Sequence, residues 1–134
     1  MIHVVVVEDD AMNALLFRKL LEKRCGYRVT VTESPEQLLA LVRAGGVGLV
    51  LMDVSLANSR YQGRAVGGVD LCRLLKSDPV TCGVPVMLAT AHAMRGDAEA
   101  LLAESGADDY VSKPIVDHGA FVEHIRRVVR AEAA

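Results

Sequence analysis

Acidic side chains follow two of the apolar segments in the sequence. Glu8, Asp9 and Asp10 come directly after four consecutive valines, and Asp53 ends the apolar segment LVLMD. A carboxylate that closes a buried segment is costly to desolvate unless it gains a partner. The carboxyl ends of parallel strands meet at one edge of a sheet, where α/β proteins bind their ligands, so we expect these carboxylates to lie close together.

Thr90 and Lys113 end two further predicted strands. They close the segments VPVMLAT and DDYVSK, so they belong to the same edge as the carboxylates. Clustered carboxylates repel one another, and a divalent cation removes that repulsion. Oxygen ligands in an open, wet site favour Mg²⁺ over zinc, with Mn²⁺ as a substitute. The sequence therefore predicts a magnesium site with a hydroxyl and an ammonium group beside it.

This set of side chains suits phosphoryl transfer. A cation held by Glu8 and Asp9 keeps coordination positions open for a phosphoryl oxygen. The hydroxyl of Thr90 and the ammonium of Lys113 can take the other two oxygens. Asp53 stands alone at its strand end and is then the nucleophile, because a carboxylate can form an acyl phosphate.

Each of these side chains also has an ordinary structural interpretation. We expect Asp10 to cap a helix or to carry a first-turn charge rather than to bind a metal. A single aspartate such as Asp53 is often a turn residue, a threonine is common in strands, and a lysine is commonly a solvated charge. Suitable residue types at four strand ends together favour a functional site over four independent structural roles.

Predicted strands and helices alternate and form the scaffold for this edge. The strands are predicted at residues 2–9, 27–33, 47–53, 84–90 and 108–113, and the helices at 11–26, 34–46, 68–78, 94–107 and 117–134. Short strands that are apolar on both faces and separated by helices predict a parallel α/β sheet covered on both sides. The first helix is expected to bury an apolar stripe made of Met12, Leu15, Leu16, Leu20 and Leu21.

Length and composition exclude several classes of protein. The chain of 134 residues fits one domain, and its net charge of −2 argues against a nucleic-acid partner. No apolar run approaches the ~20 residues of a membrane span, and the N-terminus lacks the features of a signal peptide. The three cysteines form no C-x-x-C pair, which fits a reducing compartment. We therefore expect a cytoplasmic protein without a membrane partner.

The same motifs resemble those of the receiver domain of two-component response regulators. The resemblance runs from about Val4 to Val129 and is carried by VVVVEDDAMN, LVLMD, PVMLATAHAM and DDYVSKP. It implies a flavodoxin-like, doubly wound sheet of five parallel strands in the order 2-1-3-4-5, with helices on both faces. It also implies a CheY-like phosphorelay switch rather than an enzyme that turns over external substrates.

The resemblance implies a role for each acidic residue. Asp53 would accept a phosphoryl group from a sensor histidine kinase or a histidine phosphotransfer protein. Asp9, Asp53 and the backbone carbonyl of Ser55 would bind Mg²⁺ directly, and Glu8 would act on the metal through water.

The resemblance also implies how the phosphoryl group is sensed. Thr90 and Lys113 would bind its oxygens, Pro114 would follow a cis peptide bond, and Tyr110 would turn inward as Thr90 shifts. The added charge is expected to reshape the surface formed by the helix at 94–107, the strand at 108–113 and the terminal helix. An unknown downstream effector would read this surface, which is also the place where we expect a weak homodimer.

The sequence departs from the family pattern after Asp53. Ala57 stands where the family usually has proline, and residues 55–68 are longer than a usual βα loop and are expected to form an exposed loop. In this family the side chains at Ser55 and His92 tune the lifetime of the phosphate. The loop also carries residues that could meet a partner or, more simply, be solvated: Arg60, Tyr61 and Arg64.

A single-domain response regulator is the function we expect, with alternatives from two other classes. One is a phosphorylation-silent receiver that serves as a binding module, for which Ala57 and the long loop leave room, or a receiver fragment of a hybrid histidine kinase. The other is an aspartyl phosphatase of the haloacid-dehalogenase type. That chemistry needs a second aspartate two residues after the nucleophile, and Ser55 occupies the position instead.

Overall fold

The computed structural model describes residues 2–56, 60–91 and 97–133, so the predicted positions Ala57 and His92 lie outside the described residues. The main sheet consists of β1 (His3–Val7), β2 (Arg28–Thr32), β3 (Val47–Asp53), β6 (Val86–Thr90) and β7 (Asp109–Ser112). The helices are α1 (Ala11–Lys19), continued by the π-helical turn η1 (Leu20–Arg24), α2 (Pro35–Arg43), α3 (Gly68–Ser77), α4 (Asp97–Ser105) and α5 (His118–Ala133).

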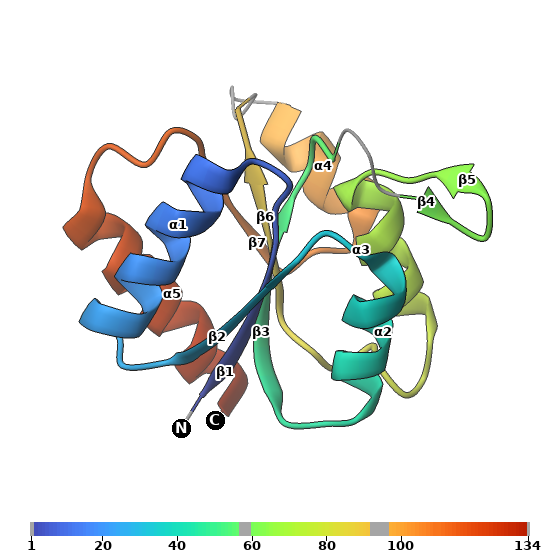
Figure 1. The fold of residues 1–134 in the computed structure, drawn as a ribbon, viewed down its shortest axis with the longest axis horizontal. Coiled ribbons are helices and arrows are strands. Elements are labelled where there is room, and N and C mark those ends of the chain that lie inside the picture. The colour runs from blue at the N-terminus through green and yellow to red at the C-terminus, as the bar shows by residue number, and fades with distance from the viewer. Residues whose placement is uncertain (1, 57–59, 92–96, 134) are drawn as a thin grey trace.

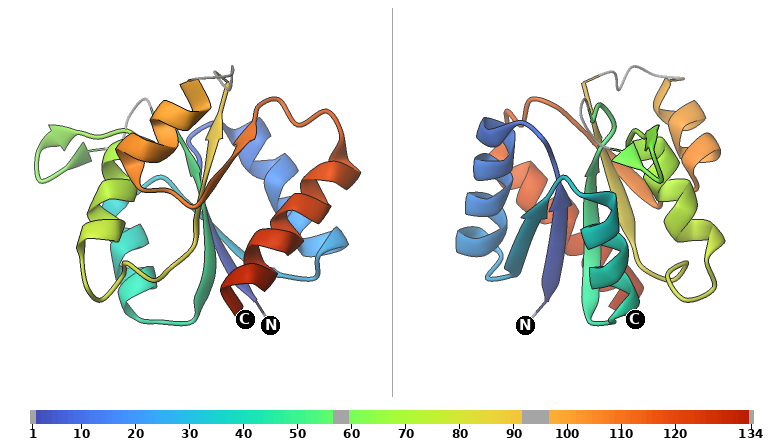
Figure 2. Two further views of the ribbon diagram at one scale, coloured as in Figure 1. Left: turned by 180° about the vertical axis from the view of Figure 1, so that it is seen from behind. Right: turned by 45° about the vertical axis from the view of Figure 1, so that its right-hand side comes forward.

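The five strands of the main sheet are parallel and lie in the order β2-β1-β3-β6-β7. This is the predicted order 2-1-3-4-5, because a separate hairpin takes the labels β4 and β5. Helices α1 and α5 cover one face of the sheet, and α2, α3 and α4 cover the other (Figures 1 and 2). None of the helices in the described part of the chain has the length and apolar character that a membrane span requires.

The central strands are buried on both faces. Val4 and Val6 of β1 belong to the core under α1 and α5, whereas Val5 and Val7 belong to the core under α2 and α3. All four valines have no exposed surface. This two-sided burial agrees with the unbroken valine run, which lacks the alternation of a half-exposed strand.

The buried face of α1 differs from the predicted stripe. Met12 is 77% exposed and Leu15 is 49% exposed, whereas Phe17 is buried and stacks on Phe121 of α5 with ring centroids 5.7 Å apart. Successive helical residues are turned by about 100°, which places Met12 and Leu15 on the side opposite Phe17. The prediction was wrong for these two residues because the helix turns its aromatic side chain toward α5. Leu20 and Leu21 are buried as expected.

The long segment after β3 contains regular structure that the sequence analysis did not predict. Strands β4 (Arg60–Tyr61) and β5 (Arg64–Ala65) form an antiparallel hairpin that projects beside α3 (Figure 1). Gln62 and Gly63 connect them with φ values of 52° and 80°. Two left-handed residues in succession are typical of the tight turn that suits a two-residue hairpin loop. The strands are too short to show alternation in the sequence.

Candidate functional site

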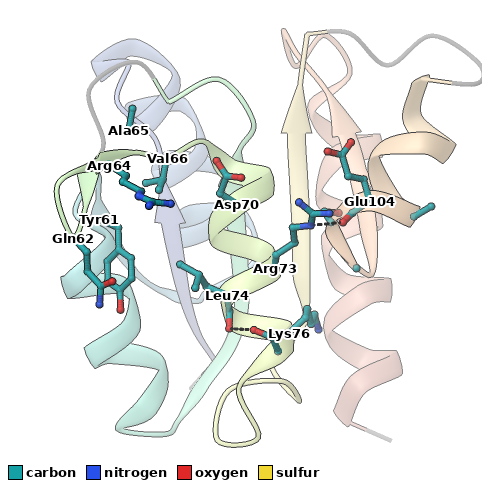
Figure 3. A pocket seen from close by; sticks show the side chains of 14 residues that line it. Tyr61, Gln62, Arg64, Ala65, Val66, Asp70, Arg73, Leu74, Lys76 and Glu104 are labelled. Atoms are coloured by element: carbon teal, nitrogen blue, oxygen red, sulfur yellow. Dashed lines mark hydrogen bonds between the residues drawn. The ribbon is translucent and has the colours of Figure 1, made fainter.

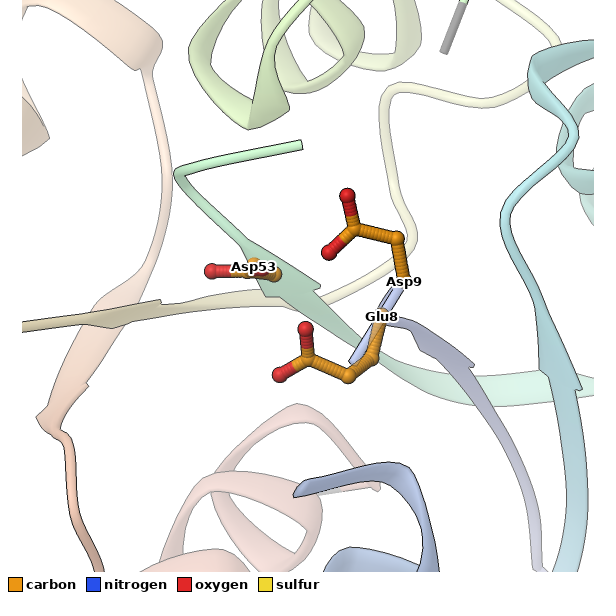
Figure 4. Close-up of side chains that lie close together, drawn as sticks. All are labelled: Glu8, Asp9 and Asp53. Carbon is orange, nitrogen blue, oxygen red and sulfur yellow. The ribbon is translucent and has the colours of Figure 1, made fainter. Parts of the chain in front are cut away.

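Three carboxylates meet at the carboxyl ends of β1 and β3 (Figure 4). Oxygen atoms of Glu8, Asp9 and Asp53, one from each side chain, all lie within 4.8 Å of one another. Glu8 and Asp53 are buried, with 4% and 3% of their surface exposed, and Asp9 is half-buried. All-oxygen groups at this spacing can hold a hard divalent cation such as Mg²⁺.

The register of the two central strands brings these carboxylates together. Val7 of β1 is paired with Met52 of β3, so the residues that follow, Glu8 and Asp53, leave adjacent strands side by side. Asp53 is in turn paired with Ala89 of β6, which places Thr90 one residue beyond that pair. Thr90 is buried, with 2% of its surface exposed.

Lys113 reaches the carboxylates from β7. Its Nζ lies 2.8 Å from Oδ1 of Asp53 and 3.4 Å from Oε1 of Glu8. Its backbone N–H donates to the carbonyl of Thr90 at 2.8 Å, and the Lys113–Pro114 peptide bond is cis, as the resemblance implied. Lys113 is therefore a cation that contacts two of the three carboxylates, Glu8 and Asp53.

Burial and mutual contact shift the pKa values of these groups. Burial, together with the hydrogen bond and charge of Asp53, raises the pKa of Glu8 to about 7. Burial alone would also raise the pKa of Asp53, but hydrogen bonds with Glu8 and Lys113 outweigh it and hold the pKa below its ordinary value. Burial alone would lower the pKa of Lys113, yet Asp53 and Glu8 raise it. Of the hydrogen-bonded pair, Asp53 is therefore the more acidic carboxylate and Glu8 the one that holds its proton more tightly, which suits Asp53 as a nucleophile.

Asp10 and Ser55, which lie next to the carboxylates in the chain, form hydrogen bonds that hold the local backbone in place. Asp10 is the N-cap of α1, since its Oδ1 accepts from the N–H groups of Met12 and Asn13 at 2.9 and 3.0 Å. This is the structural interpretation that we preferred for it. The N–H of Ser55 donates to Oδ1 of Asp53 at 3.2 Å and fixes the backbone that leads away from β3.

Gly68 is a site residue whose function depends on its lack of a side chain. A Cβ at this position would overlap the carbonyl oxygen of Asp53 and lie 2.8 Å from its carbonyl carbon. The N–H of Gly68 also donates to the carbonyl of Val54 at 3.2 Å. Helix α3 therefore begins in direct contact with the backbone of Asp53, a closeness that the sequence alone does not reveal.

The remaining predicted residues lie apart from the three carboxylates. Tyr110 of β7 is half-buried and packs against the core on the side of α2 and α3. Arg60 and Arg64 are exposed on the hairpin, and Tyr61 between them is half-buried. The sequence did not reveal a groove beside this hairpin, because one of its walls, the end of α4, comes from a distant part of the chain.

The comparison with protein families agrees with the geometry of the site. The model of the response regulator receiver domain matches residues 4–126. The polar-differentiation response regulator DivK of Brucella ovis is 38% identical over 112 residues, which cover 84% of this chain and 84% of that protein. DivK of Brucella anthropi is 37% identical over the same length and coverage.

Solved structures are similar over nearly the whole chain. The receiver domain of a sensor histidine kinase from Pseudomonas aeruginosa PAO1, whose structure has a magnesium ion coordinated in its active-site cleft, is 25% identical with a TM-score of 0.77, covering 96% of this chain and 97% of that one. A CheY-like receiver domain protein from Methanospirillum hungatei JF-1 shares the fold, with 21% identity, a TM-score of 0.78 and coverage of 99% and 97%.

Proposed function

Because the chain belongs to the response regulator receiver domain family, we propose that Asp53 is its phospho-acceptor and that the acceptance of the phosphoryl group depends on Mg²⁺. The convergence of Glu8, Asp9 and Asp53 within 4.8 Å, with Lys113 at 2.8 Å from Asp53, carries this proposal. The donor would be a sensor histidine kinase or a histidine phosphotransfer protein. The phosphorelay operates in the cytoplasm, within a receiver domain that spans residues 1–134.

The chemistry at Asp53 is the transfer of a phosphoryl group from nitrogen to oxygen. A carboxylate oxygen of Asp53 forms the new bond to phosphorus, and the bond from phosphorus to the donor histidine breaks with its electron pair left on the nitrogen. Asp9, Asp53 and the carbonyl of Ser55 would hold Mg²⁺, with Glu8 acting through water, and the ion would supply positive charge to neutralise the phosphoryl oxygens. Mn²⁺ has similar ligand preferences.

Lys113 and Thr90 would hold the phosphoryl group after transfer. Lys113 already lies within hydrogen-bond distance of Asp53 Oδ1, so its ammonium group needs little movement to pair with a phosphoryl oxygen. Thr90 is next to the strand pair Asp53–Ala89 and would supply its hydroxyl group. Ser55 and His92 are the positions that we propose to set the lifetime of the phosphate.

The added charge would change the surface formed by α4, β7 and α5. Lys113 and Thr90 would connect Asp53 to this surface, because Lys113 directly follows β7 and Thr90 ends β6. Tyr110 of β7 would turn inward in response. A downstream effector that prefers the new shape shifts the population toward it. The same surface is where we propose the weak homodimer.

Acetyl phosphate tests the phospho-acceptor directly. Incubation of the chain with acetyl phosphate and Mg²⁺ should produce a phosphate-sized gain in intact mass, and EDTA should abolish it. Asp53→Asn should also abolish the gain, whereas Asp97→Asn, at an exposed aspartate of α4, should keep it. Absence of the gain in the wild-type protein would reject the proposal in favour of a phosphorylation-silent binding module.

A further inference from the structure

A groove lies between the hairpin, α3 and the end of α4, on elements that contribute none of the three carboxylates (Figure 3). We call it the hairpin groove and define it by residues 61–66, 70–77 and 103–106. Its volume is about 1040 Å³. The hairpin forms one complete wall, so the groove exists because of the long segment after β3.

The floor of the hairpin groove is apolar, and its side chains pack against the hydrophobic core. Tyr61, Val66 and Leu74 line it, and all three are half-buried and pack against the core under α2 and α3. The outward parts of these side chains therefore offer a firm apolar surface rather than a mobile one. Burial of one aliphatic or aromatic side chain on such a surface is a typical anchor for a bound peptide.

Two arginines stand at the rim of this floor. Among the described residues, the exposed guanidinium of Arg64 has no hydrogen bond or ion pair. Arg73 donates from Nε to the carbonyl of Glu104 at 2.9 Å, and within the same described residues its two terminal NH₂ groups have no protein acceptor. Both arginines can therefore donate hydrogen bonds to a carboxylate without first breaking an ion pair, in the bidentate geometry that guanidinium groups favour.

The other charged groups of the groove are largely satisfied by their own neighbours. Lys76 forms an ion pair with Asp108 at 2.8 Å. The carboxylate of Asp70 accepts from the N–H of Gly67 at 3.0 Å, at the N-terminus of α3, where a negative charge is favoured. The lining holds three cationic side chains and two carboxylates, a net charge of +1. Among the described residues, Arg64 and Arg73 are the two of these cations that form no ion pair.

We propose that the hairpin groove docks an acidic segment of a partner protein. An aliphatic or aromatic side chain of that segment would lie on Tyr61, Val66 and Leu74, and flanking carboxylates would pair with Arg64 and Arg73. A polyphosphate ligand fits less well, because its concentrated charge would meet the carboxylates of Asp70 and Glu104. A peptide can space its acidic groups so that they reach the arginines and avoid those carboxylates.

This docking site is independent of the phosphorylation proposed for Asp53. The groove is formed in the structure of the unmodified chain, and its floor and rim arginines belong to the hairpin and α3. An Asp53→Asn variant should therefore bind the same segment. Failure of phosphorylation and failure of docking can be told apart, since either can occur without the other.

Three labelled decapeptides test the chemistry of the groove by NMR titration of the full chain. The acidic peptide with an apolar centre, GSEDLFEDSG, should shift the backbone amides of Tyr61, Leu74 and Gly106 most strongly. It should bind at least about tenfold more tightly than the basic peptide GSKKLFKKSG and the acidic peptide without the apolar centre, GSEDSSEDSG. Shifts confined to other parts of the chain, equal binding of all three peptides, or no binding would each overturn the proposal.

Charge reversal at the rim sharpens the same test. Arg64→Glu should weaken binding of GSEDLFEDSG about tenfold and improve binding of GSKKLFKKSG, whereas Arg127→Glu, an identical change on the exposed side of α5, should alter neither. Inorganic triphosphate should fail to displace the acidic peptide. Displacement by the triphosphate, or equal effects of the two charge reversals, would show that the groove does not recognise an acidic segment.

Discussion

The carboxylate site and the hairpin groove both depend on the segment that leaves β3, yet they are built in different ways. The site consists of charged groups at the ends of strands that are buried on both faces, and Glu8, Asp53 and Lys113 contact one another directly. The groove consists of side chains on an inserted hairpin and two helices. Its exposed Arg64 has no hydrogen bond or ion pair among the described residues, and Arg73 has one hydrogen bond, to the carbonyl of Glu104.

This difference indicates where each region tolerates change. The carboxylate site is closely packed where α3 begins, and a methyl group added at Gly68 would overlap the backbone of Asp53. The rim of the groove faces solvent, so its residues can change with little effect on folding. Residues around the carboxylate site are therefore expected to tolerate few substitutions. Residues at the rim of the groove are expected to tolerate many, so the binding specificity of the groove can change without loss of the fold.

The largest expected contrast between the two regions comes from alanine at two glycines. Gly68→Ala places a Cβ against the backbone of Asp53, which no rotamer change can relieve, and should lower the free energy of unfolding by about 3 kcal/mol or more. Gly63→Ala, in the hairpin turn, meets open space and has only the strain of its positive φ, about 1 kcal/mol. Urea denaturation of both variants measures the difference, and similar losses at both glycines would contradict it.

A smaller contrast is expected from the pH dependence of stability without metal. The pKa of Glu8 is about 7 in the folded chain against an ordinary value of 4.5. A raised carboxyl pKa means that the folded state holds the proton more tightly, so the contribution of Glu8 is complete below pH 4.5 and is lost as the pH rises through 7.

The relevant measurement is the difference in melting temperature between the wild type and Glu8→Gln, in EDTA, across this pH range. The wild type should lose a few degrees relative to the variant as the pH rises. The difference isolates Glu8, because His3, whose pKa is lowered by burial and by Arg28, changes stability in the opposite direction in both proteins. A difference that does not vary with pH would show that Glu8 is not buried beside Asp53.

The smallest expected effect belongs to the rim of the groove. Arg64→Glu should change the free energy of unfolding by less than about 0.5 kcal/mol, because the side chain is exposed and forms no hydrogen bond or ion pair with the described residues. Phosphate uptake from acetyl phosphate should equal that of the wild type. A large loss of stability or of uptake would mean that the hairpin supports the carboxylate site and is not a separate binding element.

Much of the carboxylate site could be predicted from the sequence because its members end apolar segments. A run of valines buried on both faces can only be an inner strand, and inner parallel strands bring their carboxyl ends to one edge. Glu8, Asp9, Asp53, Thr90 and Lys113 were therefore expected at that edge. The same local pattern also predicted that Asp10 caps α1, which its hydrogen bonds to Met12 and Asn13 confirm.

The amino-acid sequence by itself determined the element order, the parallel sheet and the acidic edge, since each follows from local patterns of apolar and polar residues. Tertiary structure decided which side of α1 is buried, how closely α3 approaches Asp53, and that the segment after β3 becomes a hairpin with a groove. The hairpin is local, but its strands are too short to show alternation in the sequence. The other features arise from contacts between residues farther apart in the chain, such as Phe17 with Phe121 and Arg73 with Glu104. No local pattern contains such contacts, because their energy depends on shapes that exist only after the elements have packed.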